Sequence, residues 1–212
     1  MSALRKPVVP VGLGFRAGRG GSIVVAVAND GHVPRMVLSA FLATAEEGDR
    51  LSLEPYHVAA EMARGAQGKA PKEAVSAVTE GRKRQDRLAA KGLADLARRL
   101  EEAHCKPARA ALLVNRAGWI TDLLEYSLFA PEHPAVAEGL AVRDAFRHAF
   151  ARCGLDVVEM DEKSLADSAS KALGLSAARI DERVKTLGAG AKPWRKEHKL
   201  ACLAAWLALS AR

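Results

Sequence analysis

Short runs of apolar residues at the start of the chain predict three β-strands. The runs cover residues 8–16, 22–28 and 35–44, and Asn29-Asp30-Gly31, a common hairpin sequence, separates the second from the third. We therefore expect three antiparallel strands to open the domain. Pro10 lacks a backbone N–H, so the first strand is expected either to begin after it or to have an edge there.

The next part of the chain predicts helices and one buried strand. Residues 46–70 are expected to form a connection with one short helix, because Gly65 and Gly68 lie near its end and Pro71 follows it. From Lys72 onward, apolar residues recur at helical spacing, and this helix is expected to end near Lys106-Pro107. Residues 110–115 are almost continuously apolar, as in strands covered on both faces.

The remaining third of the chain predicts further helices around one more strand. We expect helices at residues 135–153, 164–173, 176–187 and 195–209, and a strand at residues 155–160. Gly154 is expected to end the first of these helices. Taken in order, the elements predict an α/β fold: a mixed sheet of three antiparallel and then two parallel strands, flanked by helices.

Length and composition favour a single domain over residues 1–212, with residues 1–7 as a flexible tail. The three cysteines are far apart, which predicts a reducing, cytoplasmic location. The most apolar stretch, residues 200–209, is about half the length needed to cross a membrane, so no membrane partner is expected. Oligomeric state is left open.

The net charge of the chain indicates which kinds of partner are reasonable. The net charge of +7 makes a polyanion such as nucleic acid a reasonable partner, although a solvated basic surface explains it equally simply. The basic run Arg82-Lys83-Arg84 has few aromatics near it, so sequence-specific reading of bases is not expected.

Several segments resemble the Holliday-junction-resolvase branch of the ribonuclease-H-like superfamily. They are residues 88–111, 137–159 and 171–187, and Glu197-His198-Lys199-Leu200-Ala201 at the start of the last helix. Pro55-Tyr56-His57 and the 137–145 segment are also similar to segments of bacterial proteins. The resemblance implies a ribonuclease-H-like fold over the whole chain.

The chemistry of that family requires several carboxylates that hold two divalent cations. The corresponding positions here hold Gly14, Asn115, Glu197 and Leu200, so one acid of four remains. The resemblance therefore implies a non-catalytic or atypical member that binds nucleic acid or a protein partner.

The alternative is a metal-dependent phosphodiester hydrolase, using Mg or Mn at a rearranged acidic site. Its candidate catalytic residues are Glu197, Glu138, Asp144 and His57. Each also has a structural explanation: the helix dipole favours an acid at Glu197, and Glu138 and Asp144 can pair with Arg143 on a wet surface. His57 has no nucleophile assigned to it. A purely structural or assembly role is the third hypothesis.

Five basic residues are candidate phosphate ligands: Arg16, Arg19, Arg143, Lys196 and Lys199. The first two follow a glycine-rich segment, Gly12-Leu13-Gly14, that resembles part of a dinucleotide-binding sequence. That sequence functions only before a helix, and here a strand is expected to follow, so we favour a tight glycine-rich hairpin.

Overall fold

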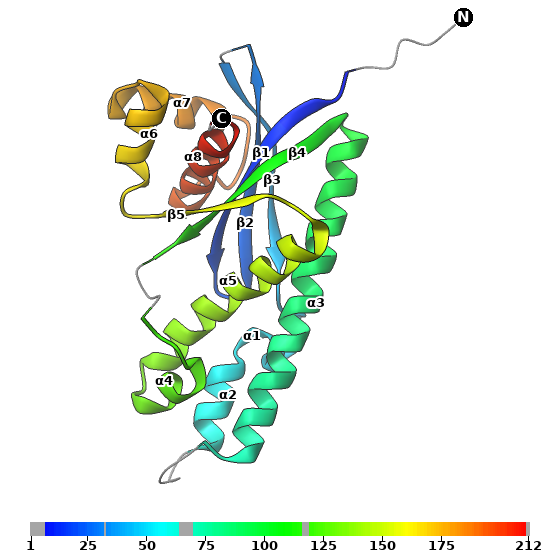
Figure 1. Cartoon of the computed structure of the whole chain (residues 1–212), viewed down its shortest axis with the longest axis vertical. Coiled ribbons are helices and arrows are strands. Elements are labelled where there is room, and N and C mark those ends of the chain that lie inside the picture. Colours follow the sequence, from blue (N-terminus) through cyan, green and yellow to red (C-terminus); the bar gives the residue numbers. More distant parts are fainter. Residues whose placement is uncertain (1–6, 32, 64–69, 116–118, 211–212) are drawn as a thin grey trace, which may run out of the picture.

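A five-stranded mixed sheet forms the centre of the protein (Figure 1). The computed structural model describes residues 7–31, 33–63, 70–115 and 119–210. The strand order is β3-β2-β1-β4-β5, in which β1 pairs antiparallel with β2 and parallel with β4. The strands are β1 (Val9–Gly18), β2 (Gly21–Asp30), β3 (Val33–Ala43), β4 (Cys105–Val114) and β5 (Val157–Asp161). This arrangement confirms the predicted mixed sheet.

Helices cover both faces of the sheet. On one face lie α3 (Lys72–Glu102) and α5 (His133–Cys153), and on the other lie α6 (Leu165–Leu173), α7 (Ala177–Leu187) and α8 (Lys196–Ser210). Three short helices, α1 (Arg50–Leu53), α2 (Pro55–Met62) and α4 (Leu123–Phe129), pack beside the parts of α3 and α5 that extend past the sheet (Figure 1). Within the described residues, no helix has the length and apolarity to cross a bilayer.

Three predictions about the elements were wrong: the number of helices before α3, the absence of α4, and the end of α3. Residues 46–70 contain two short helices rather than one, and α4 was not predicted at all. The long helix ends at Glu102, so Lys106 and Pro107 belong to β4. Pro107 is tolerated there because β5 pairs with β4 only from Ala110 onward, which leaves this end of β4 with one neighbour. Pro10 likewise lies outside the ladder between β1 and β2.

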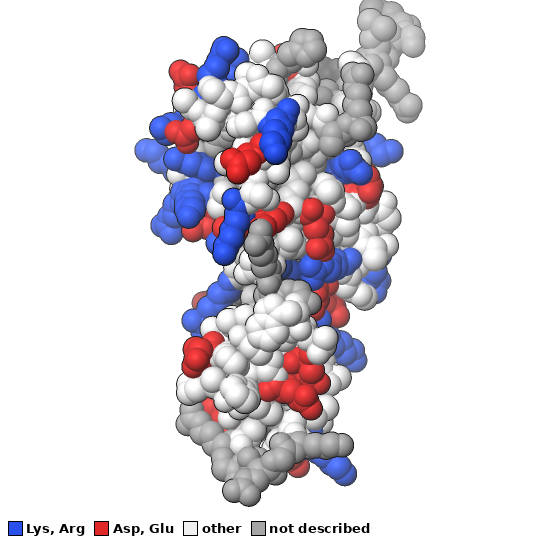
Figure 2. Space-filling view, turned by 60° about the vertical axis from the view of Figure 1, so that its left-hand side comes forward, with Lys and Arg blue, Asp and Glu red and all other residues white. Residues whose placement is uncertain are grey.

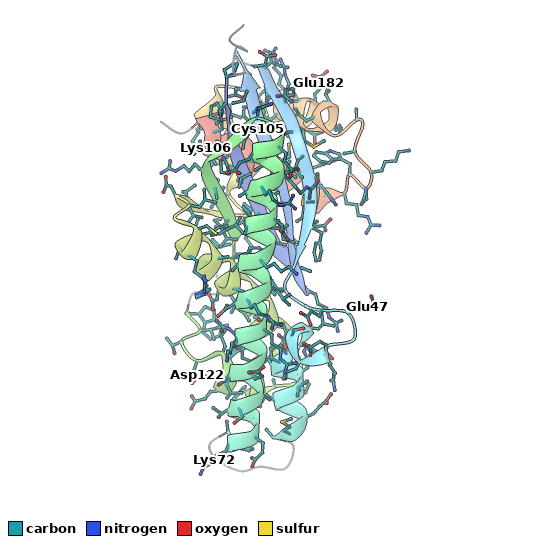
Figure 3. The ribbon with its side chains drawn as sticks, turned by 90° about the vertical axis from the view of Figure 1, so that its right-hand side faces the viewer. Glu47, Lys72, Cys105, Lys106, Asp122 and Glu182 are labelled. Carbon is teal, nitrogen blue, oxygen red and sulfur yellow. The ribbon has the colours of Figure 1, made fainter. Side chains whose placement is uncertain are left out.

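The apolar residues form three clusters. Alternate residues of β1, among them Leu13 and Phe15, pack against α3 and α5, where Phe15 contacts Phe150 edge to face with ring centroids 4.8 Å apart. The opposite face of the sheet packs on α8. A smaller cluster, which includes Tyr56 and Val78, joins α2, α3 and α5 beyond the sheet. Figure 3 shows α3 running from Lys72 past this small cluster and along the sheet toward Cys105.

The backbone of α8 approaches β1 unusually closely. Gly12 and Gly14 face this helix, and a Cβ at either position would overlap the carbonyl oxygen of Ala205 or Ala201, respectively. The two glycines therefore serve close helix packing rather than a hairpin, and the tight turn lies further on, at Gly20, where φ is +72°. No side chain fits at Gly14, which is the position matched to the first-strand acid of the resolvases.

We expect Gly14→Ala to destabilise the fold by about 1–3 kcal/mol, because the added methyl group forces α8 away from β1. Gly139→Ala is the matched control. Gly139 lies within α5 with open space around it, so alanine there should stabilise the fold by about 0.5–1 kcal/mol. Urea unfolding followed by circular dichroism measures both, and equal midpoints for the two variants would contradict the close packing.

Candidate anion-binding site

A hollow of about 360 Å³ lies where the carboxyl ends of β1, β4 and β5 meet the start of α8. We call it the smaller hollow. Ligands of open α/β sheets commonly bind at this edge. Four cationic side chains and one carboxylate line it; its residues are Arg16, Asn115, Arg143, Glu162, Lys163, Lys196 and Leu200.

Arg16 and Glu162 form the one ion pair seen among these lining residues. Arg16 lies two residues after Gly14 on β1 and therefore on the same face of the sheet, just beyond the contact with α8. Its Nε lies 3.3 Å from Oε2 of Glu162, which follows β5. The backbone N–H of Glu162 donates to the carbonyl of Val114 at 2.9 Å, which holds Glu162 beside the end of β4.

Arg143 reaches this hollow from α5. Its Nη1 donates to Oδ1 of Asn115 at 2.8 Å, while its Nε is buried and finds no hydrogen-bond partner among the described residues. Burial lowers the pKa of the Arg143 guanidinium, but an arginine in a protein keeps its charge. A buried, charged N–H donor without an acceptor is costly, so the interior around Arg143 favours an added acceptor such as water or an anion.

A second hollow, of about 540 Å³, begins on the other side of Arg143 and Asn115, which line both. We call it the larger hollow. It lies between α3, α4, α5 and the ends of β4 and β5. Asp144 accepts from Nη2 of Arg82 at 3.1 Å and from Nη1 of Arg147 at 2.6 Å, so one carboxylate fixes two guanidinium groups along its wall.

In Figure 2, Lys and Arg side chains are most numerous on the left-hand side of the upper part of the molecule, and a few more lie where it narrows. Acidic side chains lie between them at this level, as the pairs formed by Arg16, Arg82 and Arg147 require. The narrow part of the molecule is therefore basic but internally paired.

Two of the four candidate catalytic residues, Glu138 and His57, lie together and line neither hollow. Glu138 is 4% exposed, and its Oε1 accepts from the backbone N–H groups of Tyr56 at 2.7 Å and His57 at 3.2 Å. Nδ1 of His57 lies 3.5 Å from the same oxygen. Burial raises the pKa of Glu138 to about 8. This carboxyl group anchors the first turn of α2, which is a structural role.

The other two candidate catalytic residues are separate from this pair. Asp144 lines the larger hollow and is held by Arg82 and Arg147. Glu197 is half-buried in the first turn of α8 and lines neither hollow. The structure therefore does not bring the four into one site.

The structure brings three of the five candidate phosphate ligands together and leaves two apart. Arg16, Arg143 and Lys196 meet in the smaller hollow. Arg19 points elsewhere, with its Nη2 2.6 Å from Oε2 of Glu54, and Lys199 lines a separate apolar hollow beside α6 and α7. Sequence reasoning missed Glu162 and Lys163. Their position directly after a predicted strand was the available signal.

An exposed aromatic cluster on and beside α4 was also missed. Phe129 is 84% exposed and Trp119 is 70% exposed, although large apolar side chains are usually covered. The rings of Tyr126 and His133 are stacked with centroids 3.9 Å apart, and Trp119 meets Tyr126 edge to face. Leu123 and Leu124 of the same helix line the larger hollow, so the cluster adjoins it.

The acids present do not fit the metal centre of a two-metal hydrolase. Across the described part of the chain, no three His, Cys, Asp or Glu side chains lie close enough to hold one cation. In the smaller hollow the single carboxylate, Glu162, is paired with Arg16, and Arg143 and Lys196 would repel a cation. The site is suited to an anion.

The sheet order and its helical layers define a ribonuclease-H-like fold. Among solved structures, two of RuvC from Thermus thermophilus are similar. One has a TM-score of 0.53 at 12% identity, covering 95% of this chain and 93% of that chain. The other, RuvC in complex with a Holliday junction substrate, has a TM-score of 0.53 at 11% identity over 96% and 93%.

Sequence comparisons add nothing to this similarity. No family model matches the chain, and no curated protein matches it. At such low identity the likeness to RuvC concerns the fold.

The raised pKa of Glu138 predicts that stability falls as the pH rises. The folded protein holds this proton more tightly than the unfolded chain, so the contribution is complete below about pH 4.5 and is lost progressively up to about pH 8. Glu138→Gln keeps the acceptor for Tyr56 and His57 but does not ionise. Urea unfolding between pH 5 and 8.5 should show a steeper decline for the parent protein than for this variant. Parallel declines would contradict the assignment.

Proposed function

We propose that this protein binds the sugar-phosphate backbone of a nucleic acid in the smaller hollow and does not cleave it by a two-metal mechanism. The observation that carries the proposal is the lining of that hollow. Arg16, Arg143 and Lys196 converge at the carboxyl edge of the parallel strands, together with Lys163.

Two further features support nucleic acid rather than a small inorganic anion. The net charge of +7 favours a polyanion, because each neutralised phosphate releases counterions. The exposed rings on α4, including Phe129 and Trp119, offer surface on which bases stack with little regard to sequence.

The similar RuvC structures suggest which nucleic acid to test first. One of them is in complex with a Holliday junction substrate, so four-way DNA junctions are the first probe for this chain. Single-stranded and duplex DNA and RNA complete the set. Fluorescence anisotropy at low salt should detect binding of at least one of these in the micromolar range. Absence of binding to all of them would leave the protein-partner hypothesis in its place.

Replacing Arg143 with alanine should weaken binding and make its salt dependence shallower by about one unit in a plot of log K against log salt, because one phosphate contact is lost. Arg16→Ala and Lys196→Ala should act similarly. Arg98→Ala is the control, since Arg98 lies near the far end of α3 and pairs with Glu102. If Arg98→Ala weakens binding as much as Arg143→Ala, the smaller hollow is not the binding site.

We expect no cleavage when the protein is incubated with Mg²⁺ or Mn²⁺ and junction, duplex or single-stranded DNA. The reason is that the acidic side chains of the described residues do not form a shared metal site. A denaturing gel measures whether any DNA strand has been cut. Cleavage that disappears in a Glu162→Gln variant but persists in Glu197→Gln would instead support a hydrolase centred on the smaller hollow.

A further inference from the structure

We infer that the larger hollow receives the base of a single unpaired nucleotide, while the phosphate of that nucleotide is held by Arg143. The inference rests on the proposed function, because it extends the phosphate site into the adjoining space. The ligand chemistry is one nucleotide unit, which either belongs to a strand or is free in solution.

Arg143 and Asn115 connect the two hollows. Both side chains line each hollow, and the hydrogen bond between them forms the divide. The Nε of Arg143 is the buried donor without a partner among the described residues. An anion that accepts from the guanidinium of Arg143 lies at the boundary, so a group attached to that anion by a few bonds reaches into the larger hollow.

The size of the larger hollow fits such a group. Its volume of about 540 Å³ lies within the range of sites that bind small molecules. One side is apolar and comes from β4, the start of α4 and the middle of α5. Its residues are Val114, Ile120, Leu123, Leu124 and Leu140. Figure 3 places Asp122, the residue before α4, alongside the lower half of α3.

The larger hollow is also lined by flat guanidinium groups in fixed positions, each held by a carboxylate of the same lining: Arg82, Arg147, Asp144 and Glu159. Arg82 and Arg147 share Asp144, and Arg82 also donates from Nη1 to the hydroxyl of the buried Tyr56 at 3.1 Å. Guanidinium planes stack on nucleobases, and unpaired bases are the form in which their faces and edges become accessible. A lining that combines apolar side chains with fixed guanidinium groups therefore suits an aromatic heterocycle better than an aliphatic chain.

A base within a continuous duplex cannot enter such a hollow, because it remains stacked and paired. An extruded or unpaired base can enter, and the cost of extrusion is smallest when the base has no pairing partner. The hollow therefore favours substrates that carry unpaired nucleotides over perfect duplexes of the same length.

The test compares two duplexes that differ by one base. One carries a single bulged thymidine, and the other carries an abasic residue at the same place. We expect about tenfold tighter binding of the bulged thymidine, because stacking of one base accounts for a difference of that order. A titration with thymidine 5′-monophosphate asks whether the free nucleotide is the ligand instead.

Two variants fill the larger hollow with an indole. Leu140→Trp does so from its apolar wall, and Thr121→Trp does so from its exposed rim, where folding is not at risk. Both should abolish the tenfold preference and any binding of the monophosphate, but leave binding of the abasic duplex unchanged. Val136→Trp, four residues earlier on the exposed face of α5, is the matched control and should change nothing.

The possible outcomes separate this inference from the proposed function. Equal binding of the two duplexes, with no binding of the monophosphate, overturns the inference while backbone binding stands. The inference is also overturned if the preference for the bulged thymidine over the abasic residue survives in both Leu140→Trp and Thr121→Trp. Saturable binding of the monophosphate without binding of any oligonucleotide supports the hollow as a free-nucleotide site and overturns the proposed function instead.

Discussion

The close packing of α8 on β1 determines where a ligand can bind in this protein. Gly12 and Gly14 have no side chains, so the helix backbone rests directly on the strand beside Ala201 and Ala205. Arg16 is the next residue on that face and the first whose side chain lies beyond the helix. The guanidinium group is therefore directed to the edge of the sheet, where β4 and β5 also end. A bulkier residue at Gly12 or Gly14 would force α8 away from the strand.

This packing also explains why no acidic side chain can stand at Gly14. A carboxylate at Gly14 has no space, and the helix turn that contains Leu200 contributes an apolar side chain to the smaller hollow. Where related chemistry needs negative charge to hold cations, this protein has arginine and lysine. An anion that elsewhere approaches the protein through metal ions is expected here to contact the side chains directly.

Much of the fold was predictable because local patterns determine it. Apolar runs marked β1 to β5, and helical spacing marked α3, α5 and the helices after β5. The failures have local causes too. The seven residues of α4 are too few for a clear helical period, and Pro107 suggested the end of a helix although it lies in an end of β4 that has a single neighbour.

The candidate site was predictable only in part. Arg16, Arg143 and Lys196 stood out as basic residues near expected strand ends or helix starts, and the structure brings them together. The role of Glu138 was not accessible from sequence, because its partners Tyr56 and His57 are 82 and 81 residues away along the chain. The pairing of Arg16 with Glu162 depends on the order of β1, β4 and β5, which local patterns do not reveal.

The long helix α3 gives the larger hollow a fixed width. With 31 residues it extends about 46 Å. Its residues Ala74 and Val78 are embedded in the small cluster, whereas Leu93 and Leu96 are embedded in the core beneath the sheet. Arg82 lies between these two anchored segments, so the backbone that carries its side chain is held in place. A nucleotide bound there as proposed would therefore meet a preorganised wall, which lowers the entropic cost of binding.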